Sequence, residues 1–523
     1  MKITPHTLLF IISLCLATSC IQYGNDSAFY KVVDYYAGDS LKEKAALFLA
    51  NNSRYHYGHS RKVVDSLGNP TNINYKGFDT DTLFLNHLLA NGYKYETGEK
   101  VWDSDTITED FLKENIELAF DSWQKPWSRS VSFEDFCRYI LPYRNGDEEL
   151  SDWRRKFKEK YEAEIEDSVD DITSIREVAL FLMRRLKQDV KYGTRLGIFY
   201  GMQFLTPEEM ERMHTMECKG LAHYGTLVLR ACGVPCTTIE THWRFTEIVH
   251  TSILIPQTGT NNKACRLSIY DELQEMGAEK DSMASWRTWS YEYEPNHKLQ
   301  ELSKDKSIPS HLYDPVTRKD ITDDFSTTYS FRRHVPKDIQ KKRNIFLCRF
   351  HDFKWYPIRE GIIENDSVLF EKATIRQLYR LGYFNGGELK TFGEVFTLLG
   401  DGRQKAYDNT GDTVMFKLVF NCEPEETNLK RDITAYRWAG SNESVEKGEL
   451  SPVKGIGTLW GLNEKTGEYK IFEENMRKDF KPVFHLMEVH LPMWTAFTHN
   501  EFPRPLGFIV ADSNTNEGYM MQF

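Results

Sequence analysis

The sequence lacks the features that mark several common classes of protein. No stretch reaches about 18 consecutive apolar residues, which excludes a permanent membrane-spanning helix. No C-x-x-C pair is present, and His214, His223 and His242 do not have the spacing of zinc ligands, so we predict no metal site. Gly-rich phosphate-binding loops are also absent, because the Gly-Asp-Gly-Arg run at 400–403 is typical of a hairpin turn. The sequence therefore predicts no cofactor.

Positive charge is scarcer than negative charge. The chain has 66 Lys and Arg against 77 Asp and Glu, which gives a formal net charge of −11. No long basic run interrupts this balance. A nucleic-acid partner would require a basic patch, so we expect no nucleic-acid binding.

Length and composition indicate a globular protein of several domains. A chain of 523 residues is too long for one hydrophobic core, and domains usually contain about 100–200 residues. The hydrophobic content of 40% and the charged content of 27% are ordinary for globular domains. We therefore expect about three or four folded units.

The first twenty residues have the pattern of an export signal. Lys2 gives a positive start, residues 8–16 form a short apolar run, and small residues at 17–19 precede Cys20. This order resembles the cleavage site of bacterial lipoproteins, which implies that Cys20 becomes the lipid-modified first residue of the mature chain. The alternative is an ordinary secretory signal with an incidental cysteine.

The lipoprotein pattern implies a location in the cell envelope. A lipid on Cys20 anchors a protein to a membrane without spanning it. Residue 21 is Ile rather than Asp, and by analogy with lipoprotein sorting rules this favours the outer membrane. We therefore predict a membrane contact through the N-terminal lipid.

The nine cysteines do not form an evident disulfide framework. Removal of Cys15 with the signal and modification of Cys20 leave seven, so an exported chain keeps at least one unpaired thiol. Cys232 and Cys236 are four residues apart across a turn. A disulfide between these two is an alternative that the spacing leaves open.

Helical patterns dominate the first 190 residues. Amphipathic or cap-delimited segments occur at 39–52, 107–121, 133–144, 151–171 and 174–190. The mixed charges of the fourth segment indicate a solvated helix face rather than a binding surface. We expect a signal over residues 1–20, a helical N-terminal region over 21–150 and a core domain over 151–310.

Strand patterns follow residue 236. The runs 237–245, 248–256 and 264–271 have β-type composition, and a hairpin turn is predicted at 256–263. From about residue 310 onward, short strands alternate with turns, which predicts two β-sandwich modules at 311–415 and 416–523. The predicted fold class is therefore α+β. Some aromatic residues of these modules are candidates to stack on sugar rings, with burial in the sandwich core as the alternative; they are Trp355, Tyr356, Trp438 and Trp460.

Cys218 lies where a reactive thiol is expected. Residues 219–231 have the apolar face of a helix, and Gly233 and Pro235 end it. A helix N-terminus favours an anion, which would stabilise a thiolate, and its backbone N–H groups could bind an oxyanion. A buried structural cysteine is the alternative.

A histidine and an aspartate follow on separate predicted strands. Asp271 comes 21 residues after His250, and a hairpin between the two strands makes them neighbours. A carboxylate that continues an apolar strand face needs a partner, which a neighbouring histidine provides. A core histidine and an aspartate that only ends its strand are the alternatives. Other candidates for the third residue are Glu272, Asn261 and Asn262.

These residues resemble the transglutaminase-like superfamily, whose fold is papain-like. Arg230-Ala231-Cys232-Gly233-Val234-Pro235 matches the family pattern R-A-x-G-[IV]-P, and the match covers about residues 175–290, under a quarter of the chain. Segments 39–52 and 133–149 also resemble multidomain transglutaminase-like lipoproteins of Bacteroidetes. The resemblance implies a Cys-His-Asp site with Cys218 as nucleophile, His250 as base and then acid, and Asp271 as orienter of the imidazole.

Two positions depart from the family pattern. The family usually has an aromatic residue two positions after the histidine, where this chain has Ser252. It often has a tryptophan four positions before the aspartate, where this chain has Leu267. Both changes leave the three site residues intact but alter the expected pocket.

Together these patterns predict an exported lipoprotein with a thiol site that acts on amide bonds. The expected substrates are peptides or glycopeptides, and the expected reaction is acyl transfer, with hydrolysis favoured over crosslinking because water is abundant at a cell surface. Such an enzyme would be a cysteine peptidase, an amidase or a transglutaminase-like acyltransferase. The alternative function is a catalytically inactive binding protein that captures peptide or glycan through its β modules.

Overall fold

The computed structural model describes most of the chain up to residue 407 and separate strands beyond it. The described residues are 27–73, 77–78, 81–193, 206–243, 249–258, 264–270, 274–275, 285–342, 344–351, 354–375, 377, 379–407, 413–421, 430–437, 450–456, 458–463, 468–471, 478, 481–492, 495–499, 505–511 and 518–522. No helix in these ranges is both long and apolar enough to cross a membrane. The predicted signal, Cys20 and Asp271 lie outside them.

The chain divides into two compact units. The first contains Met1–Ile239, Thr251–Glu275 and Ser290–Pro295, and the second contains Glu240–His250, Met276–Trp289 and Asn296–Phe523. The domain boundaries expected from the sequence, at residues 20, 150, 310 and 415, stay a prediction.

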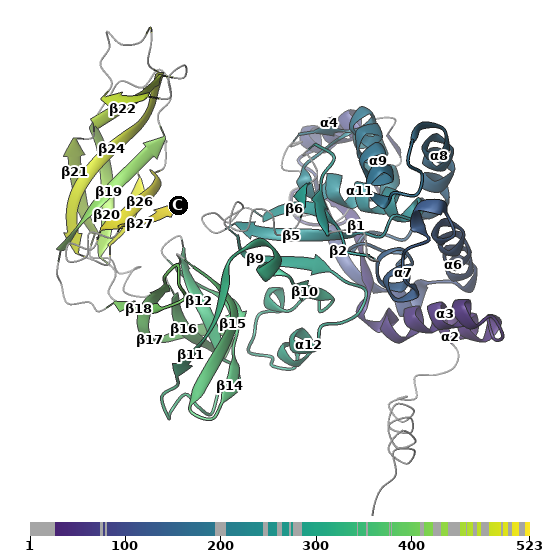
Figure 1. Cartoon of the computed structure of the whole chain (residues 1–523), viewed down its shortest axis with the longest axis horizontal. Coiled ribbons are helices and arrows are strands. Elements are labelled where there is room, and N and C mark those ends of the chain that lie inside the picture. Colours follow the sequence, from purple (N-terminus) through teal and green to yellow (C-terminus); the bar gives the residue numbers. More distant parts are fainter. Residues whose placement is uncertain are drawn as a thin grey trace, which may run out of the picture. The chain divides into compact units, whose positions relative to one another are not determined.

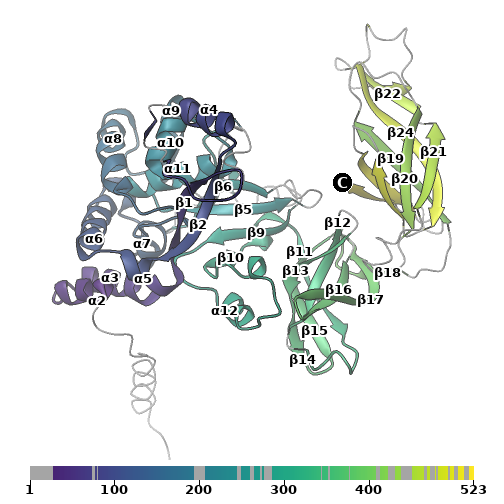
Figure 2. The same ribbon diagram turned by 180° about the vertical axis from the view of Figure 1, so that it is seen from behind.

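The first unit is rich in helices (Figures 1 and 2). They are α2 (Ala28–Tyr35), α3 (Ser40–Asn52), α4 (Asp81–Asn91), α5 (Asp103–Thr106), α6 (Glu109–Trp123), α7 (Phe133–Tyr139), α8 (Trp153–Ser168), α9 (Ile175–Asp189), α10 (Pro207–Met213) and α11 (Cys218–Ala231). Of these, α6, α8, α9 and α10 contact α11, and α2 and α3 contact α6. Side chains cap several N-termini: Asp39, Thr108, Ser132, Ser174 and Thr206 each accept a backbone N–H of the first turn. These caps explain why the helices begin where they do.

The helices predicted at 39–52, 107–121, 151–171 and 174–190 are confirmed as α3, α6, α8 and α9. The helix predicted at 133–144 is shorter, because α7 ends at Tyr139. Pro142 cannot donate a backbone hydrogen bond, and the chain leaves the helix before it.

The sequence did not predict the antiparallel pair of strands β1 (Tyr57–Val64) and β2 (Lys94–Trp102), in which Tyr57 pairs with Trp102 and Val64 with Lys94. Polar residues fill most of β1, so the period-two alternation of a strand is weak there. The first unit is therefore less purely helical than its sequence indicates.

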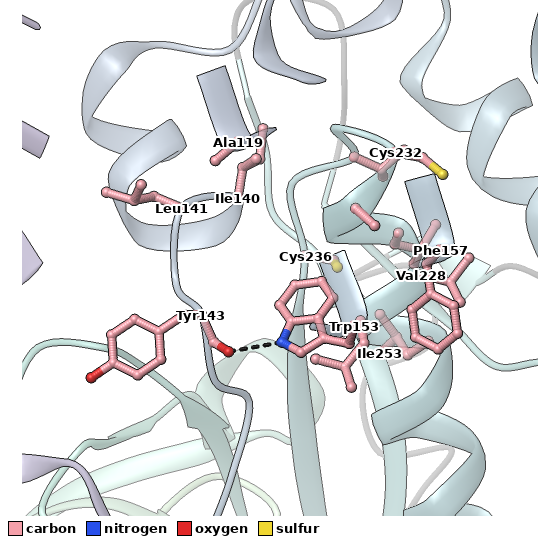
Figure 3. Close-up of a cluster of buried hydrophobic side chains, with 14 of the residues drawn as sticks. Ala119, Ile140, Leu141, Tyr143, Trp153, Phe157, Val228, Cys232, Cys236 and Ile253 are labelled. Atoms are coloured by element: carbon pink, nitrogen blue, oxygen red, sulfur yellow. Dashed lines mark hydrogen bonds between the residues drawn. The ribbon is translucent and has the colours of Figure 1, made fainter. Parts of the chain in front are cut away.

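The core of the first unit lies around α11. Every residue of this helix from Leu221 to Ala231 is buried. The helix packs against α6, α8 and α9. Figure 3 shows part of this core, where Phe157 of α8 lies near Val228 of α11 and where the indole of Trp153 donates to the carbonyl oxygen of Tyr143.

Six strands between residues 237 and 320 form a sheet of order β10-β9-β5-β6-β7-β8. Its strands are β5 (Thr237–Trp243), β6 (Val249–Ile255), β7 (Cys265–Leu267), β8 (Gln274–Glu275), β9 (Ser285–Tyr291) and β10 (Arg318–Asp320). Antiparallel pairing of β6 with β7, in which Ile253 faces Leu267, confirms the predicted hairpin. The division between the two units falls within β5 and β6. A short parallel pair, β3 (Lys191–Tyr192) and β4 (Thr215–Met216), precedes α11.

The rest of the second unit is mainly β-structure. The α-helices among its described residues are α12 (His297–Ser303) and α13 (Thr322–Phe325). Two of its sheets have the orders β11-β15-β14 and β13-β12-β16-β17-β18. Their strands are β11 (Thr328–His334), β12 (Phe346–His351), β13 (Lys354–Glu360), β14 (Ile362–Glu364), β15 (Ser367–Thr374), β16 (Tyr379–Asn385), β17 (Glu388–Leu398) and β18 (Gln404–Tyr407). The turn between β17 and β18 contains residues 400–403, as predicted, and Trp355 is buried in a hydrophobic cluster.

Beyond residue 412 the described strands form two further sheets, of orders β23-β22-β24-β19-β26-β27 and β21-β20-β25. They are β19 (Thr413–Asn421), β20 (Lys430–Arg437), β21 (Leu450–Ile456), β22 (Thr458–Asn463), β23 (Glu468–Ile471), β24 (Lys481–Pro492), β25 (Thr495–His499), β26 (Pro505–Ala511) and β27 (Gly518–Gln522). The protein thus combines helices and sheets, with the helices concentrated in the first half of the chain, which is the α+β class expected from the sequence.

Candidate functional site

Cys218 is the first residue of α11. Glu217 precedes it with an extended backbone, and the first turn closes when the N–H of Leu221 donates to the carbonyl oxygen of Glu217 at 3.0 Å. The side chain of Cys218 is partly exposed and forms no disulfide. N–H groups in the first turn of a helix have no partner within the helix, so this end of α11 has the donors that an anion or a developing oxyanion requires.

The other described cysteines differ from Cys218 because all of them are buried. They are Cys137, Cys232, Cys236, Cys265 and Cys348. Burial raises the pKa of the Cys137 and Cys236 thiols to about 12, and it raises the pKa of Cys232 and Cys348 well above the usual value. Cys232 and Cys236 are separate thiols, so the disulfide left open by the sequence does not form. Among the described cysteines, only Cys218 is placed to react.

The far end of α11 explains the Arg-Ala-x-Gly-Val-Pro motif in structural terms. Gly233 has φ of +79°, the left-handed conformation that ends a helix. The hydroxyl of Ser122 donates to the carbonyl oxygen of Ala231 at 2.7 Å, and the indole of Trp127 donates to that of Cys232 at 2.7 Å. These contacts fix the C-terminus of the helix that begins with Cys218.

Close packing also fixes the middle of α11. A Cβ on Gly225 would lie 2.7 Å from Cδ1 of Ile253, so only glycine lets β6 approach the helix this closely. Ile253 therefore points from β6 toward α11. Successive strand residues alternate between faces, which places His250, Ser252 and Leu254 on the opposite face of β6.

His250 is the second residue of β6 and is half-buried. It belongs to the second unit, whereas Cys218 belongs to the first. Asp271 and the alternatives Glu272, Asn261 and Asn262 lie outside the described residues. The pairing of His250 with Cys218 and the role of Asp271 stay a prediction.

Both departures from the family pattern lie in buried positions. Leu267 is 2% exposed and belongs to the core of the first unit, opposite Ile253 in the β6–β7 pair. Ser252 is 1% exposed, and within the described part of the chain its hydroxyl has no hydrogen-bond partner. Neither residue presents an aromatic surface to a substrate.

An irregular buried segment, residues 140–148, follows α7 and lies against α11. Arg154 of α8 donates to the carbonyl oxygens of Ile140, Leu141 and Pro142 at 2.8–3.2 Å. Arg230 of α11 donates to the carbonyl oxygen of Arg144 at 3.0 Å. Buried carbonyl groups require hydrogen-bond donors. In this segment the two arginine side chains provide the donors that backbone N–H groups provide in a regular helix or sheet.

The segment 140–148 holds Asn145 against α11. The amide of Asn145 donates to Nδ1 of His223 at 3.0 Å and to the hydroxyl of Thr238 at 2.8 Å. Both oxygens of Glu148 accept backbone N–H groups, from Asn145 and Gly146 at 2.8 Å each. Burial alone would raise the pKa of Glu148, but interaction with His223 and Arg144 and the backbone hydrogen bonds lower it below its usual value.

A histidine–carboxylate pair at this segment was not predicted from the sequence. Nδ1 of His59, on β1, lies 2.6 Å from Oδ2 of Asp147, and the backbone N–H of His59 donates to the carbonyl oxygen of Asp147 at 2.9 Å. The two side chains are 17% and 12% exposed. A carboxylate on Nδ1 fixes the orientation of an imidazole and leaves Nε2 for another partner. The residues are 88 positions apart in the chain, and no sequence motif links them.

Among the described residues, no group of three His, Cys, Asp or Glu is placed to hold a metal ion. His214 follows α10 and is exposed, whereas His223 is buried within α11. His242, on β5, is partly buried, and its removal from water lowers its pKa to about 4. The three histidines therefore lie in three different environments.

The chain was compared with protein-family models, with curated proteins and with solved structures, and none of the three comparisons finds a match.

Proposed function

We propose that the protein is an exported thiol enzyme that acts on amide bonds through Cys218. The observation that carries the proposal is the position of Cys218, which is partly exposed at the N-terminus of a 14-residue helix while the other described cysteines are buried. Thiolates are the reactive form of cysteine, and helix N-termini favour them.

In this mechanism Sγ of Cys218 attacks the carbonyl carbon of a peptide or glycopeptide amide. His250 accepts the thiol proton and then donates it to the leaving nitrogen, so an amine departs and a thioester forms. Water then attacks the thioester, His250 again transfers the proton, and the carboxylic acid is released with the thiol regenerated. The N–H groups at the start of α11 stabilise the oxyanion in both steps, and Asp271 orients the imidazole.

The proposal extends to architecture and location. A transglutaminase-like, papain-like core carries the site, and β-sandwich modules follow it. Support comes from the cysteine-first helix and from its Arg-Ala-x-Gly-Val-Pro exit, whose glycine is required by a φ of +79°. A lipid on Cys20 places the enzyme at the cell envelope, in the outer membrane.

A second candidate function is an inactive relative that binds peptide or glycan through the β modules. Two observations favour it. His250 lies on the face of β6 opposite the one that Ile253 turns toward α11. Ser252 and Leu267 are buried and provide no aromatic pocket.

Thiol labelling tests the reactivity of Cys218. We expect iodoacetamide near neutral pH to modify Cys218 in the native protein, and peptide mass mapping should find Cys232 and Cys236 unmodified until the protein is unfolded. The buried cysteines are an internal control on folding. Labelling of several cysteines at equal rates would contradict a selectively reactive Cys218.

Comparison of Cys218→Ala with His250→Gln tests the pair. In an active enzyme both changes should abolish amine release from a peptide mixture, and His250→Gln should also slow labelling of Cys218. Labelling that is unchanged in His250→Gln would reject the pairing. Efficient labelling together with no amine release from any peptide would favour the binding protein instead.

A further inference from the structure

A buried arginine lies on the antiparallel pair of β1 and β2 (Figure 2). The side chain of Arg61 is 6% exposed, and within the described part of the chain its guanidinium group donates no hydrogen bond. The carboxylate that pairs with it there is that of Glu209 on α10, whose Oε2 lies 3.9 Å from Nε of Arg61, beyond hydrogen-bond distance. Burial of a charged group without hydrogen bonds is costly, so Arg61 requires an explanation.

Glu209 is held by other groups. Its Oε1 accepts the hydroxyl of Tyr95 at 2.9 Å, and its Oε2 accepts the backbone N–H of Thr206 at 2.8 Å as part of the capping box of α10. These bonds fix Glu209 at its distance from Arg61. A guanidinium group presents its N–H donors in a planar fork that matches the two oxygens of a carboxylate. An anionic ligand would therefore supply the acceptors that the fold does not.

Arg61, His59 and Tyr57 lie on one face of β1, because alternate residues of a strand point to the same side. The pairing has one irregularity, between His59 and Arg61. Their partners Lys100 and Thr97 are three positions apart on β2, whereas His59 and Arg61 are two positions apart on β1. The additional residue therefore belongs to β2, and β1 keeps its regular alternation.

The far end of this face is aromatic and open to solvent. Tyr57 pairs with Trp102 of β2, and their rings meet edge-on with centroids 5.2 Å apart. The ring of His59 also packs edge-on against Tyr57, at 5.3 Å. Trp102 is 40% exposed. Tyr57 is four positions from Arg61, which corresponds to about 13 Å along a strand, so a ligand that contacts both ends of the face has to be extended.

His59 lies between these two ends, and Asp147 orients it. Nδ1 of His59 is 2.6 Å from Oδ2 of Asp147, and an anionic acceptor at this distance favours a proton on Nδ1. Nε2 of a neutral imidazole is then a hydrogen-bond acceptor. An acceptor between the anion site and the aromatic pair suits a backbone N–H group of an extended ligand.

We propose that this face binds the C-terminal end of a peptide, with the terminal carboxylate on Arg61, a backbone N–H on Nε2 of His59 and an apolar side chain at Tyr57 and Trp102. The choice of a peptide rests on the proposed function, in which the substrate is an amide chain, and it defines the substrates as peptides with a free C-terminus. Inorganic phosphate suits the site less well. Glu209 lies beside Arg61 and repels a dianion more strongly than a monoanion.

Titration calorimetry of the full chain carrying Cys218→Ala tests the proposal without turnover. The probe is acetyl-Phe-Ala-Ala-Ala with a free C-terminal carboxylate, whose aromatic residue is about as far from the carboxylate as Tyr57 is from Arg61. We expect saturable binding. The same peptide with a C-terminal amide should bind about tenfold or more weakly, because hydrogen bonds to the charged group are lost. Acetylated tetra-alanine with a free carboxylate should bind about threefold or more weakly.

Substitution of Arg61 identifies the site. Arg61→Met should abolish the preference for the carboxylate over the amide, and Arg61→Lys, which keeps the charge but loses the planar fork, should reduce it. Lys62→Met is the matched control, because Lys62 is the next residue of β1, is exposed on the opposite face and carries the same charge. Trp102→Ala should reduce binding of the probe to that of tetra-alanine and leave the carboxylate preference intact.

Urea unfolding separates a binding role of Arg61 from a structural one. Since Arg61→Met removes a buried charge that has no hydrogen bonds, its unfolding midpoint should be equal to or above that of the unmodified chain. A lower midpoint in Arg61→Met than in Lys62→Met would show that Arg61 serves the fold through Glu209, and the proposal would be wrong.

Four binding results would also overturn it: no saturable binding of the probe, equal binding of the carboxylate and amide peptides, inorganic phosphate that binds as tightly as the probe, or an equal loss of preference in Arg61→Met and Lys62→Met. Because every titration uses Cys218→Ala, these results do not depend on thiol activity. Peptide binding together with no amine release by the unmodified chain would reject the proposed enzyme and leave the peptide site in place.

Discussion

Gly233 ends the helix that Cys218 begins, and its replacement by alanine should destabilise the first unit strongly. Its φ of +79° lies in the left-handed region that side chains disfavour. A Cβ at this position would lie 2.3 Å from the carbonyl oxygen of Ser122 and 2.8 Å from the hydroxyl oxygen of Ser128. The first of these atoms belongs to the backbone, so segment 122–128 has to move.

The expected cost combines strain with lost hydrogen bonds. The left-handed conformation costs an alanine about 1–2 kcal/mol. The displaced segment provides three donors, from Ser122, Trp127 and Ser128, to the carbonyl groups that end α11. Each such bond contributes about 0.5–1.5 kcal/mol. We therefore expect a loss in unfolding free energy of about 3–6 kcal/mol.

Gly68 provides the matched control for Gly233. It has φ of +87°, but a Cβ there would meet no atom within 4 Å, so Gly68→Ala should cost only the conformational strain of about 1–2 kcal/mol. Urea unfolding gives the two free energies, and native-state hydrogen exchange of the α11 amides reports the local effect. If Gly233→Ala is no more destabilising than Gly68→Ala, the helix end is not held by segment 122–128 and the argument is wrong.

Three further changes test the buried polar groups of the first unit. Burial lowers the pKa of His56 from the usual value of about 6.5 to about 4. The unfolding free energy should therefore be highest above pH 6.5 and should fall by up to about 3 kcal/mol as the pH decreases toward 4. In urea unfolding, the unfolding free energy of His56→Gln should decrease less between these pH values than that of the unmodified chain. Arg154→Leu removes the hydrogen-bond donor of the Ile140 and Pro142 carbonyl groups, while that of Leu141 keeps the amide of Asn115. It should cost about 3–5 kcal/mol, with faster hydrogen exchange in segment 140–142 before any change in α3. Asp147→Asn removes the charged acceptor of His59 and should cost about 1.5–3 kcal/mol; a His59 Nδ1 proton signal in NMR spectra that is unchanged by Asp147→Asn would contradict the pair.

Much of the helical architecture follows from local chemistry that is visible in the sequence. Ser174 and Thr108 cap α9 and α6 because a short polar side chain can accept the unpaired N–H groups of the first turn. The position of Cys218 at a helix start and the end of that helix before Gly233 depend on equally local signals. Such signals act within a few residues, so reading them requires no knowledge of distant segments.

The antiparallel pair of β1 and β2 shows where local patterns fail. Strand pairing there joins Tyr57 to Trp102, and polar residues fill most of β1. The segment 140–148 has the same character, because Arg154 and Arg230 replace backbone hydrogen bonds that no local pattern specifies. Both features depend on side chains that come from other parts of the chain.

For the candidate site, the sequence indicated which residue types occur and in what order. The tertiary structure determined which of these side chains are exposed and which side chains they contact. Nine cysteines look alike in a sequence, and only packing distinguishes Cys218, which stays partly exposed, from buried thiols such as Cys232. His59 and Asp147 meet across 88 residues because the β1 backbone bonds to the segment after α7. Capping and helix termination are short-range effects and can be read from neighbouring residues, whereas burial and side-chain pairing depend on which distant segments the hydrophobic core brings together.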